Sequence, residues 1–136
     1  MKYEDLLNNL HKNKDFSIRD SKYSPQHFGD FHIELYYKNK IKLRILNDRD
    51  IIEILLIYHS FLSRNTVPLE FAVDFLNNCT NKNKEYTFSN ISDAYLFLEN
   101  SKAYLDEIAE KDLLKNISKA YNSIKERFES TEKERF

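Results

Sequence analysis

The sequence predicts an α+β fold: a three- to four-stranded antiparallel sheet with helices packed on one face, followed by a helical C-terminal half. Residues 30–57 alternate apolar and polar side chains between short polar turns, which is the pattern of an antiparallel meander. Over residues 67–130, apolar residues recur every three or four positions, as in amphipathic helices. Strands and helices are therefore segregated along the chain, and the helices are expected to cover the apolar face of the sheet.

The chain has 136 residues, a length that suits a single α+β domain over 1–136. Within residues 1–29, a short helix is predicted over 3–12 and an irregular polar segment over 13–29. Phe16 and Ile18 could form a short edge strand inside that segment.

Three strands are predicted in the meander. In the first strand, the residues that point to one face are Phe31, Ile33, Leu35 and Tyr37. The residues between them, which point to the other face, are His32, Glu34 and Tyr36. The second strand runs from Ile41 to Ile45 and the third from Ile51 to Ile57. For the third, Asp50-Ile51-Ile52-Glu53 also resembles a capping box that would start a helix. Its β-branched residues favour a strand, but the sequence leaves strand and helix open over residues 50–64.

Several helices are expected after residue 67. Pro68 suits the first turn of a helix that ends at Asn77-Asn78. A polar loop follows over 80–90, and either Asn90 or Ser92 can cap the next helix. A break is predicted near Asn100-Ser101. The last helix carries one apolar face, formed by Leu113, Leu114, Ile117, Ala120, Tyr121, Ile124 and Phe128.

Composition removes several classes of function. The chain has one glycine, Gly29, whereas phosphate-binding loops and nucleophile elbows need glycines at fixed positions. The net charge of −1 gives no global attraction to a phosphate backbone. No segment resembles a signal peptide or approaches the ~20 apolar residues that span a bilayer. A cytoplasmic protein without a membrane partner is therefore expected.

The residues of catalytic chemistry are scattered. No two of the four histidines have the close spacing of a zinc site, and Cys79 has no cysteine partner. Cys79 also follows a predicted helix C-terminus, where the helix dipole does not favour a thiolate. We expect no catalytic residue, no cofactor and no metal site, and hence no enzyme; a small hydrolase is the less favoured alternative.

Six residues are the predicted contacts to a partner. Asp48, Asp50 and Glu53 cluster at the second turn and at the start of the third strand. On the outer sheet face, Lys42 and Arg44 lie beside aromatic side chains that could stack nucleic-acid bases. Carboxylates on the same face would repel phosphates, so cross-strand ion pairs are expected instead of direct nucleic-acid binding. The predicted partner-binding residues are Asp48, Asp50, Glu53, His32, Glu34 and Tyr36.

Three segments resemble small bacterial proteins of one kind. Phe28-Gly29-Asp30-Phe31-His32-Ile33-Glu34-Leu35 is similar to their first strand, opened by a phenylalanine–glycine pair. Ile41 to Ile45, followed by Asn47-Asp48-Arg49-Asp50, is similar to their second hairpin, where members usually have glycine at the position of Asp50. Val67-Pro68-Leu69-Glu70, with Val73 and Phe75-Leu76, resembles their next helix. The chain thus resembles immunity proteins of contact-dependent inhibition and other polymorphic toxin systems.

The resemblance implies a role as an immunity protein. Such a protein binds one cognate toxin domain, often a nuclease, and neutralises it by covering its active site or its partner contacts. If the toxin is a basic nuclease, the acidic cluster of Asp48, Asp50 and Glu53 is the expected contact, because charge complementarity speeds association and sets specificity. A regulatory or structural protein-interaction domain, monomeric or homodimeric, is the alternative.

Overall fold

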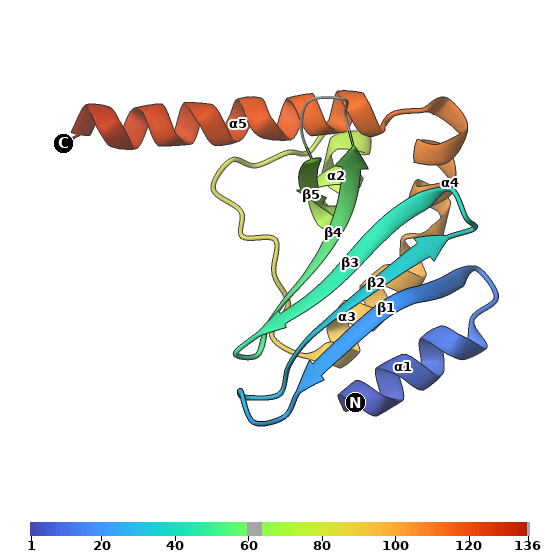
Figure 1. Ribbon diagram of the computed structural model, residues 1–136. Coiled ribbons are helices and arrows are strands. Elements are labelled where there is room, and N and C mark those ends of the chain that lie inside the picture. Colours follow the sequence, from blue (N-terminus) through green and yellow to red (C-terminus); the bar gives the residue numbers. More distant parts are fainter. Residues whose placement is uncertain (60–63, 136) are drawn as a thin grey trace.

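The computed structural model describes residues 1–59 and 64–135, with backbone alone at 64 and 126–135 (Figure 1). Its elements follow one another as α1 (Tyr3–Lys12), β1 (Phe16–Ser24), β2 (Asp30–Tyr37), β3 (Ile41–Asp48), β4 (Ile51–His59), β5 (Arg64–Pro68), α2 (Leu69–Leu76), α3 (Ile91–Asn100), α4 (Lys102–Lys111) and α5 (Leu114–Arg135). The predicted α+β class is confirmed.

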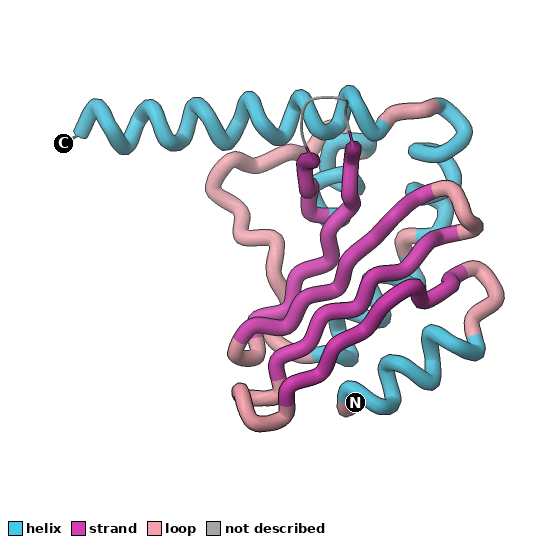
Figure 2. Tube along the Cα trace, viewed as in Figure 1, coloured by secondary structure: helices cyan, strands magenta, loops and turns pink. Residues whose placement is uncertain are grey.

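The strands form one antiparallel sheet in the order β1-β2-β3-β4-β5, so each strand pairs with the next one along the chain (Figure 2). Phe31 of β2 lies opposite Asn47 of β3, and Leu43 of β3 lies opposite Leu56 of β4. The sheet has five strands instead of the predicted three to four. Its two edge strands are β1, anticipated only as a short strand at Phe16 and Ile18, and β5, which was not predicted.

The prediction of an irregular segment over 13–29 was wrong for the nine residues of β1. Only the short edge strand at Phe16 and Ile18 was anticipated, because the alternation stops there. The register between β1 and β2 shifts between Ile18 and Asp20, which is a β-bulge. A bulge interrupts the period of two, so a real strand beyond it loses its pattern in the sequence.

The segment after Asp50 is a strand as far as His59, which confirms the favoured interpretation of β4. Residues 60–63 of the ambiguous 50–64 stretch lie outside the described part of the chain. β5 was not predicted; it ends at Pro68, which is the N-cap residue of α2 instead of a residue of its first turn. Proline is tolerated at an edge strand because no further strand needs its missing N–H group.

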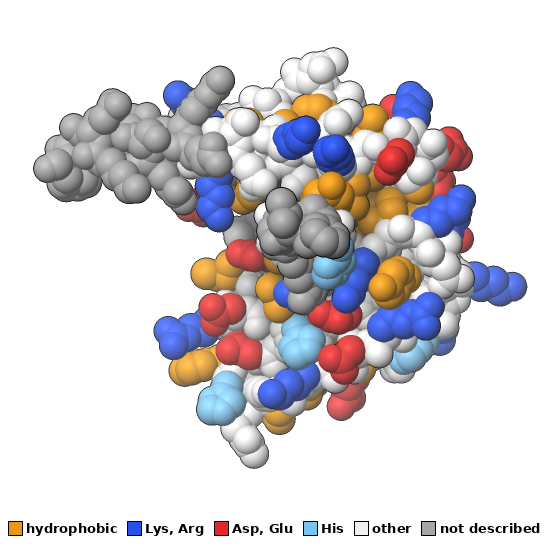
Figure 3. Space-filling model, turned by 45° about the horizontal axis from the view of Figure 1, so that its top comes forward, with side chains coloured by type: hydrophobic (Ala, Val, Ile, Leu, Met, Phe, Trp, Pro, Cys, Tyr) orange, Lys and Arg blue, Asp and Glu red, His pale blue; other side chains and the backbone are white. Residues whose placement is uncertain are grey.

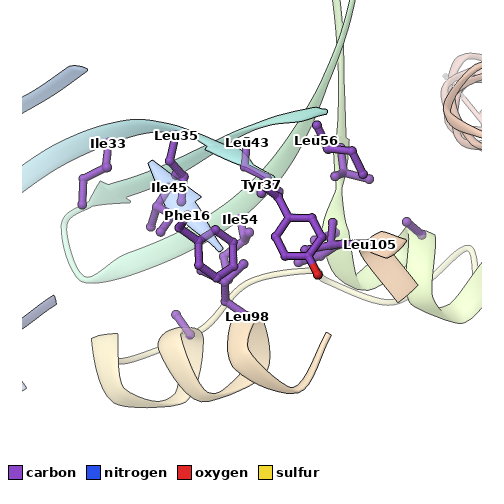
Figure 4. Packing of buried hydrophobic residues seen from close by; sticks show 14 of the residues in the cluster. Phe16, Ile33, Leu35, Tyr37, Leu43, Ile45, Ile54, Leu56, Leu98 and Leu105 are labelled. Carbon is purple, nitrogen blue, oxygen red and sulfur yellow. The ribbon is translucent and has the colours of Figure 1, made fainter. Parts of the chain in front are cut away.

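One face of the sheet, called here the closed face, forms the core with the helices. Its side chains are fully or almost fully buried, and Leu98 of α3 and Leu105 of α4 pack against them (Figure 4). Leu6 and Leu10 of α1 extend the same cluster. The closed-face residues shown in Figure 4 are Phe16, Ile33, Leu35, Tyr37, Leu43, Ile45, Ile54 and Leu56. The predicted covering of the apolar face by helices is thus confirmed.

The C-terminal helices begin and end largely where the sequence predicts. Asn90 caps α3 by accepting a hydrogen bond from the backbone N–H of Asp93 at 2.8 Å. Ser101 separates α3 from α4, as expected from the predicted break. α5 continues beyond residue 130 and projects past the sheet (Figure 1). Ile117 on its apolar face is buried in the core, whereas the side chain of Phe128 lies outside the described part.

Helix α4 is joined to the sheet by a polar contact at the end of β2. The hydroxyl of buried Tyr37 donates to the Asp106 carboxylate at 2.8 Å, and the Lys38 ammonium lies 3.0 Å from the same oxygen. These two donors, the tyrosine first, hold the pKa of Asp106 below its ordinary value. A lowered carboxylate pKa in the folded state means that the ionised carboxylate stabilises the fold.

We therefore predict that Asp106→Asn destabilises the protein at pH 7 by about 1 kcal/mol or less, since the carboxylate is partly exposed and screened. The contribution of Asp106 is present above the pKa of an unfolded aspartate and is lost as the pH falls through the folded pKa. Urea unfolding at pH 7 and pH 3 measures this: the difference between wild type and variant should shrink at pH 3. Glu107→Gln, which affects a solvent-exposed pair with Lys111, is the matched control. An equal effect of the two variants at pH 7 contradicts the assignment.

Candidate interaction surface

The face of the sheet opposite the core is called here the open face. In the view of Figure 1, no helix lies in front of β1, β2 and β3 on this side. The alternation that buries the core residues points the intervening side chains to the open face. Among them are His32, Glu34 and Tyr36 of β2, Lys42, Arg44 and Leu46 of β3, and Glu53 of β4.

The charges at the centre of the open face are paired with one another. Glu34 accepts a hydrogen bond from the Arg44 guanidinium at 2.7 Å, and the Lys42 ammonium lies 3.6 Å from its other oxygen. The expected cross-strand ion pairs are therefore present. Both cations that could have attracted a nucleic acid are engaged by one carboxylate, which lowers their value as phosphate ligands.

The β1 side of the open face carries two further polar contacts. His32 lies 3.6 Å from the Asp20 carboxylate, and the Arg19 guanidinium stands 5.1 Å from the centre of the Tyr36 ring. These contacts link half-buried His32 and Tyr36 of β2 to exposed residues of β1. Acidic, basic and histidine side chains intermingle over the molecular surface seen in Figure 3. The structure thus places four predicted contacts, His32, Glu34, Tyr36 and Glu53, on one face.

Asp48 and Asp50, the other two predicted contacts, lie at one end of the sheet. They belong to a surface called here the hairpin tip, formed by the β1–β2 turn at residues 24–30 and the β3–β4 turn at residues 47–51. The two turns are joined: the Arg49 N–H donates to the Asp30 carboxylate at 2.8 Å, and the Asn47 amide donates to the Gly29 carbonyl at 3.0 Å. Both aspartates are exposed.

The hairpin tip also exposes two large apolar side chains that the sequence did not single out. Phe28 is 73% exposed and Ile51 is 55% exposed. Phe28 has a backbone φ of +58°, a region that bulky residues seldom adopt, and Arg49 stands 5.7 Å from its ring centre. Exposed apolar side chains within an acidic rim are typical of a protein contact. A turn sequence alone does not show which of its side chains face outward.

Glu53 opens onto a cavity of about 420 Å³, called here the β4 groove. β4 and β5 form one wall, the segment 84–87 forms another, and α5 the third. The lining residues are Glu53, Leu55, Thr66, Pro68, Lys84, Glu85, Tyr86, Thr87, Tyr121 and Lys125. Only Glu53 among them was a predicted contact. The sequence did not indicate the groove because it joins segments separated by up to 72 positions (125 minus 53).

The remaining candidates, Cys79 and the possible metal ligands, form no cluster of reactive side chains in the described part of the chain. Cys79 follows the C-terminus of α2, and partial desolvation, followed by the nearby Asp74 carboxylate, raises the pKa of its thiol. Among the side chains that the structure describes, those of residues 1–59 and 65–125, no group of three or more from His, Cys, Asp or Glu could hold a metal ion. Over the same ranges, no helix has both the length and the apolar character needed to cross a lipid bilayer.

Comparison with known proteins gives no relative: no family model, no curated protein and no solved structure matches the chain. The candidate interaction surface is therefore described from the residues and contacts of this chain alone.

The β3–β4 turn yields a prediction about Asp50. Arg49 and Asp50 both have positive φ, +53° and +66°, as the two-residue turn of a tight hairpin requires. This conformation favours glycine, which has no Cβ atom to clash with the backbone. We predict that Asp50→Gly raises the free energy of unfolding by about 0.5–1 kcal/mol, measured by urea denaturation.

Asp48→Gly is the control for this substitution. Asp48 is the last residue of β3, where glycine is unfavourable, so this variant should be destabilised. Equal effects of glycine at the two positions, or a loss of stability at Asp50, would show that the turn does not have the described backbone.

Proposed function

We propose that this protein is an immunity protein, which binds a cognate bacterial toxin domain and neutralises it in the cytoplasm. The observation that carries the proposal is the combination of a sheet face over which no described helix lies at β1 to β3 with an acidic, partly apolar hairpin tip at its end. The resemblance of the strand, turn and helix segments to immunity proteins supplies the identity of the partner. A neutralising protein requires a complementary surface and no catalysis, which fits the scattered reactive side chains.

The surface is suited to binding because its side chains are held before a partner arrives. Glu34, Lys42 and Arg44 restrain one another on the open face, and the two turns of the hairpin tip are joined by hydrogen bonds. Side chains that are already ordered lose less conformational entropy on association. Phe28 and Ile51 then provide apolar anchors, around which Asp48 and Asp50 favour a basic partner such as a nuclease domain.

Pairing through the edge of the sheet is less suited to this role. β1 forms one edge, and it carries a bulge together with the exposed charges Arg19, Asp20 and Lys22. Charges and bulges on an edge strand hinder the addition of a strand from another chain. The face and the tip are therefore the better candidates for the contact.

The proposal predicts the effect of reversing the acidic charges. We expect the neighbouring gene to encode the toxin domain. The triple variant Asp48→Lys, Asp50→Lys and Glu53→Lys should bind that domain at least tenfold more weakly than wild type, measured by calorimetry. It should also fail to rescue growth when the toxin is co-expressed. Unfolding curves establish that the variant is folded.

The matched control reverses three carboxylates on the helices of the closed face, Glu4, Glu107 and Glu110. It makes the same change in net charge, so it separates a local contact from general electrostatic attraction. Equal weakening by both variants, or no weakening by the first, would remove Asp48, Asp50 and Glu53 from the interface. Failure of the wild type to bind the toxin domain or to rescue growth would overturn the proposed function itself.

A further inference from the structure

We propose that the β4 groove binds an arginine side chain of the partner, with Glu53 as its carboxylate ligand. This rests on the proposed function and specifies its chemistry: the partner inserts one basic side chain into a preformed cavity beside the open face. The volume of about 420 Å³ lies in the range of about 300–1,000 Å³ that is typical of sites for small ligands.

Two tyrosine rings form rigid walls of the groove. The ring of Tyr121 from α5 stands edge-on to buried Phe71 at 5.0 Å, and the ring of Tyr86 stands edge-on to the same phenylalanine at 5.8 Å. Phe71 belongs to the hydrophobic core, so both tyrosines are fixed by core packing. The Lys84 ammonium already stands 5.6 Å over the Tyr86 ring, so the ring of Tyr121 is the stacking surface offered to a planar cation.

The charges around the groove favour a cation over an anion. The Lys84 ammonium lies 3.0 Å from the Glu70 carboxylate and 2.9 Å from the Asp74 carboxylate. Its positive charge is therefore already balanced by two carboxylates of α2. Glu53 is half-buried, and no ion pair in the described part of the chain involves it. Burial and then the charge of Glu53 raise the pKa of Tyr121, which shows that this carboxylate acts across the groove.

Arginine matches this arrangement better than other side chains do. Its guanidinium is planar, so it can stack on a tyrosine ring while it donates two parallel hydrogen bonds to the Glu53 carboxylate. A lysine ammonium would gain the charge interaction without the stacking. A carboxylate or phosphate would be repelled by Glu53 and by its neighbour on the rim, Glu85. Lys125 is exposed and lies on the α5 side of the groove.

The test uses short peptides and the full-length protein. Acetyl-Gly-Arg-Gly-amide should cause saturable amide shifts in NMR spectra, confined to residues of the β4 groove, with a Kd of about 1–10 mM. The same peptide with citrulline, which has the shape of arginine without its charge, should bind at least fivefold more weakly. An absence of saturable shifts in the groove, or equal binding of the two peptides, overturns the proposal.

Variants then assign the ligand. Glu53→Gln should weaken the arginine peptide at least fivefold, and Tyr121→Ala should also weaken it, whereas Glu107→Gln on α4 should have no effect. Unchanged binding by folded Glu53→Gln protein overturns the assignment of Glu53. The comparison of the arginine and citrulline peptides on wild-type protein already tests whether the groove binds arginine. That test holds even where a variant fails to fold. Toxin binding by wild type, measured separately, distinguishes failure of this groove from failure of the proposed function.

Discussion

The structure depends on the asymmetry of one antiparallel sheet. Its closed face presents a layer of apolar side chains, interrupted at the end of β3 by buried Asn47, and this layer is stable only when helices exclude water from it. α1, α3 and α4 meet that requirement on one side, whereas no described helix lies over β1 to β3 on the other. The open face is consequently built from side chains that satisfy one another in contact with water, and it is available to a partner.

A second constraint comes from the scarcity of glycine. Beside Gly29, seven described residues of other types have positive φ: Phe28, Lys38, Asn39, Arg49, Asp50, Asn78 and Asp112. Such conformations cost about 1–2 kcal/mol each for residues with a side chain, so the surrounding structure must impose them. Four of these eight residues lie in the hairpin tip, where hydrogen bonds between the two turns hold the backbone. Three of the seven strained residues, Phe28, Arg49 and Asp50, therefore lie beside exposed apolar side chains of the hairpin tip.

Much of the fold could be predicted from the sequence because its central elements follow a simple period. β2 and β3 bury alternate residues, and β4 shares this period until the consecutive buried residues Ile54 to Ile57. The helix cap at Asn90 and the break at Ser101 depend on local chemistry alone. β1 was anticipated only at Phe16 and Ile18 because a bulge then breaks its alternation, and β5 was missed because five residues, the last of them a proline, give too short a pattern. Edge strands are defined by pairing with a neighbour, which the local sequence does not express.

The candidate site was predictable only in part, for a related reason. The clustering of Asp48, Asp50 and Glu53 is visible in the sequence because these residues are close along the chain. Tyr86 and Tyr121 approach Glu53 only through tertiary packing around Phe71, so no local pattern marks them. Tyr121 was expected on the apolar face of the last helix, and it does contact the core, while it also lines the β4 groove.

The asymmetry of the sheet is tested most directly by two truncations on the same strand. Leu43 is fully buried on the closed face, whereas Leu46 is partly exposed on the open face. Leu43→Ala should lower the free energy of unfolding by about 3 kcal/mol, and Leu46→Ala by about 1 kcal/mol or less, in urea denaturation of the isolated protein. Similar losses for the two variants would mean that both faces are covered, and would contradict a free face on which a partner docks.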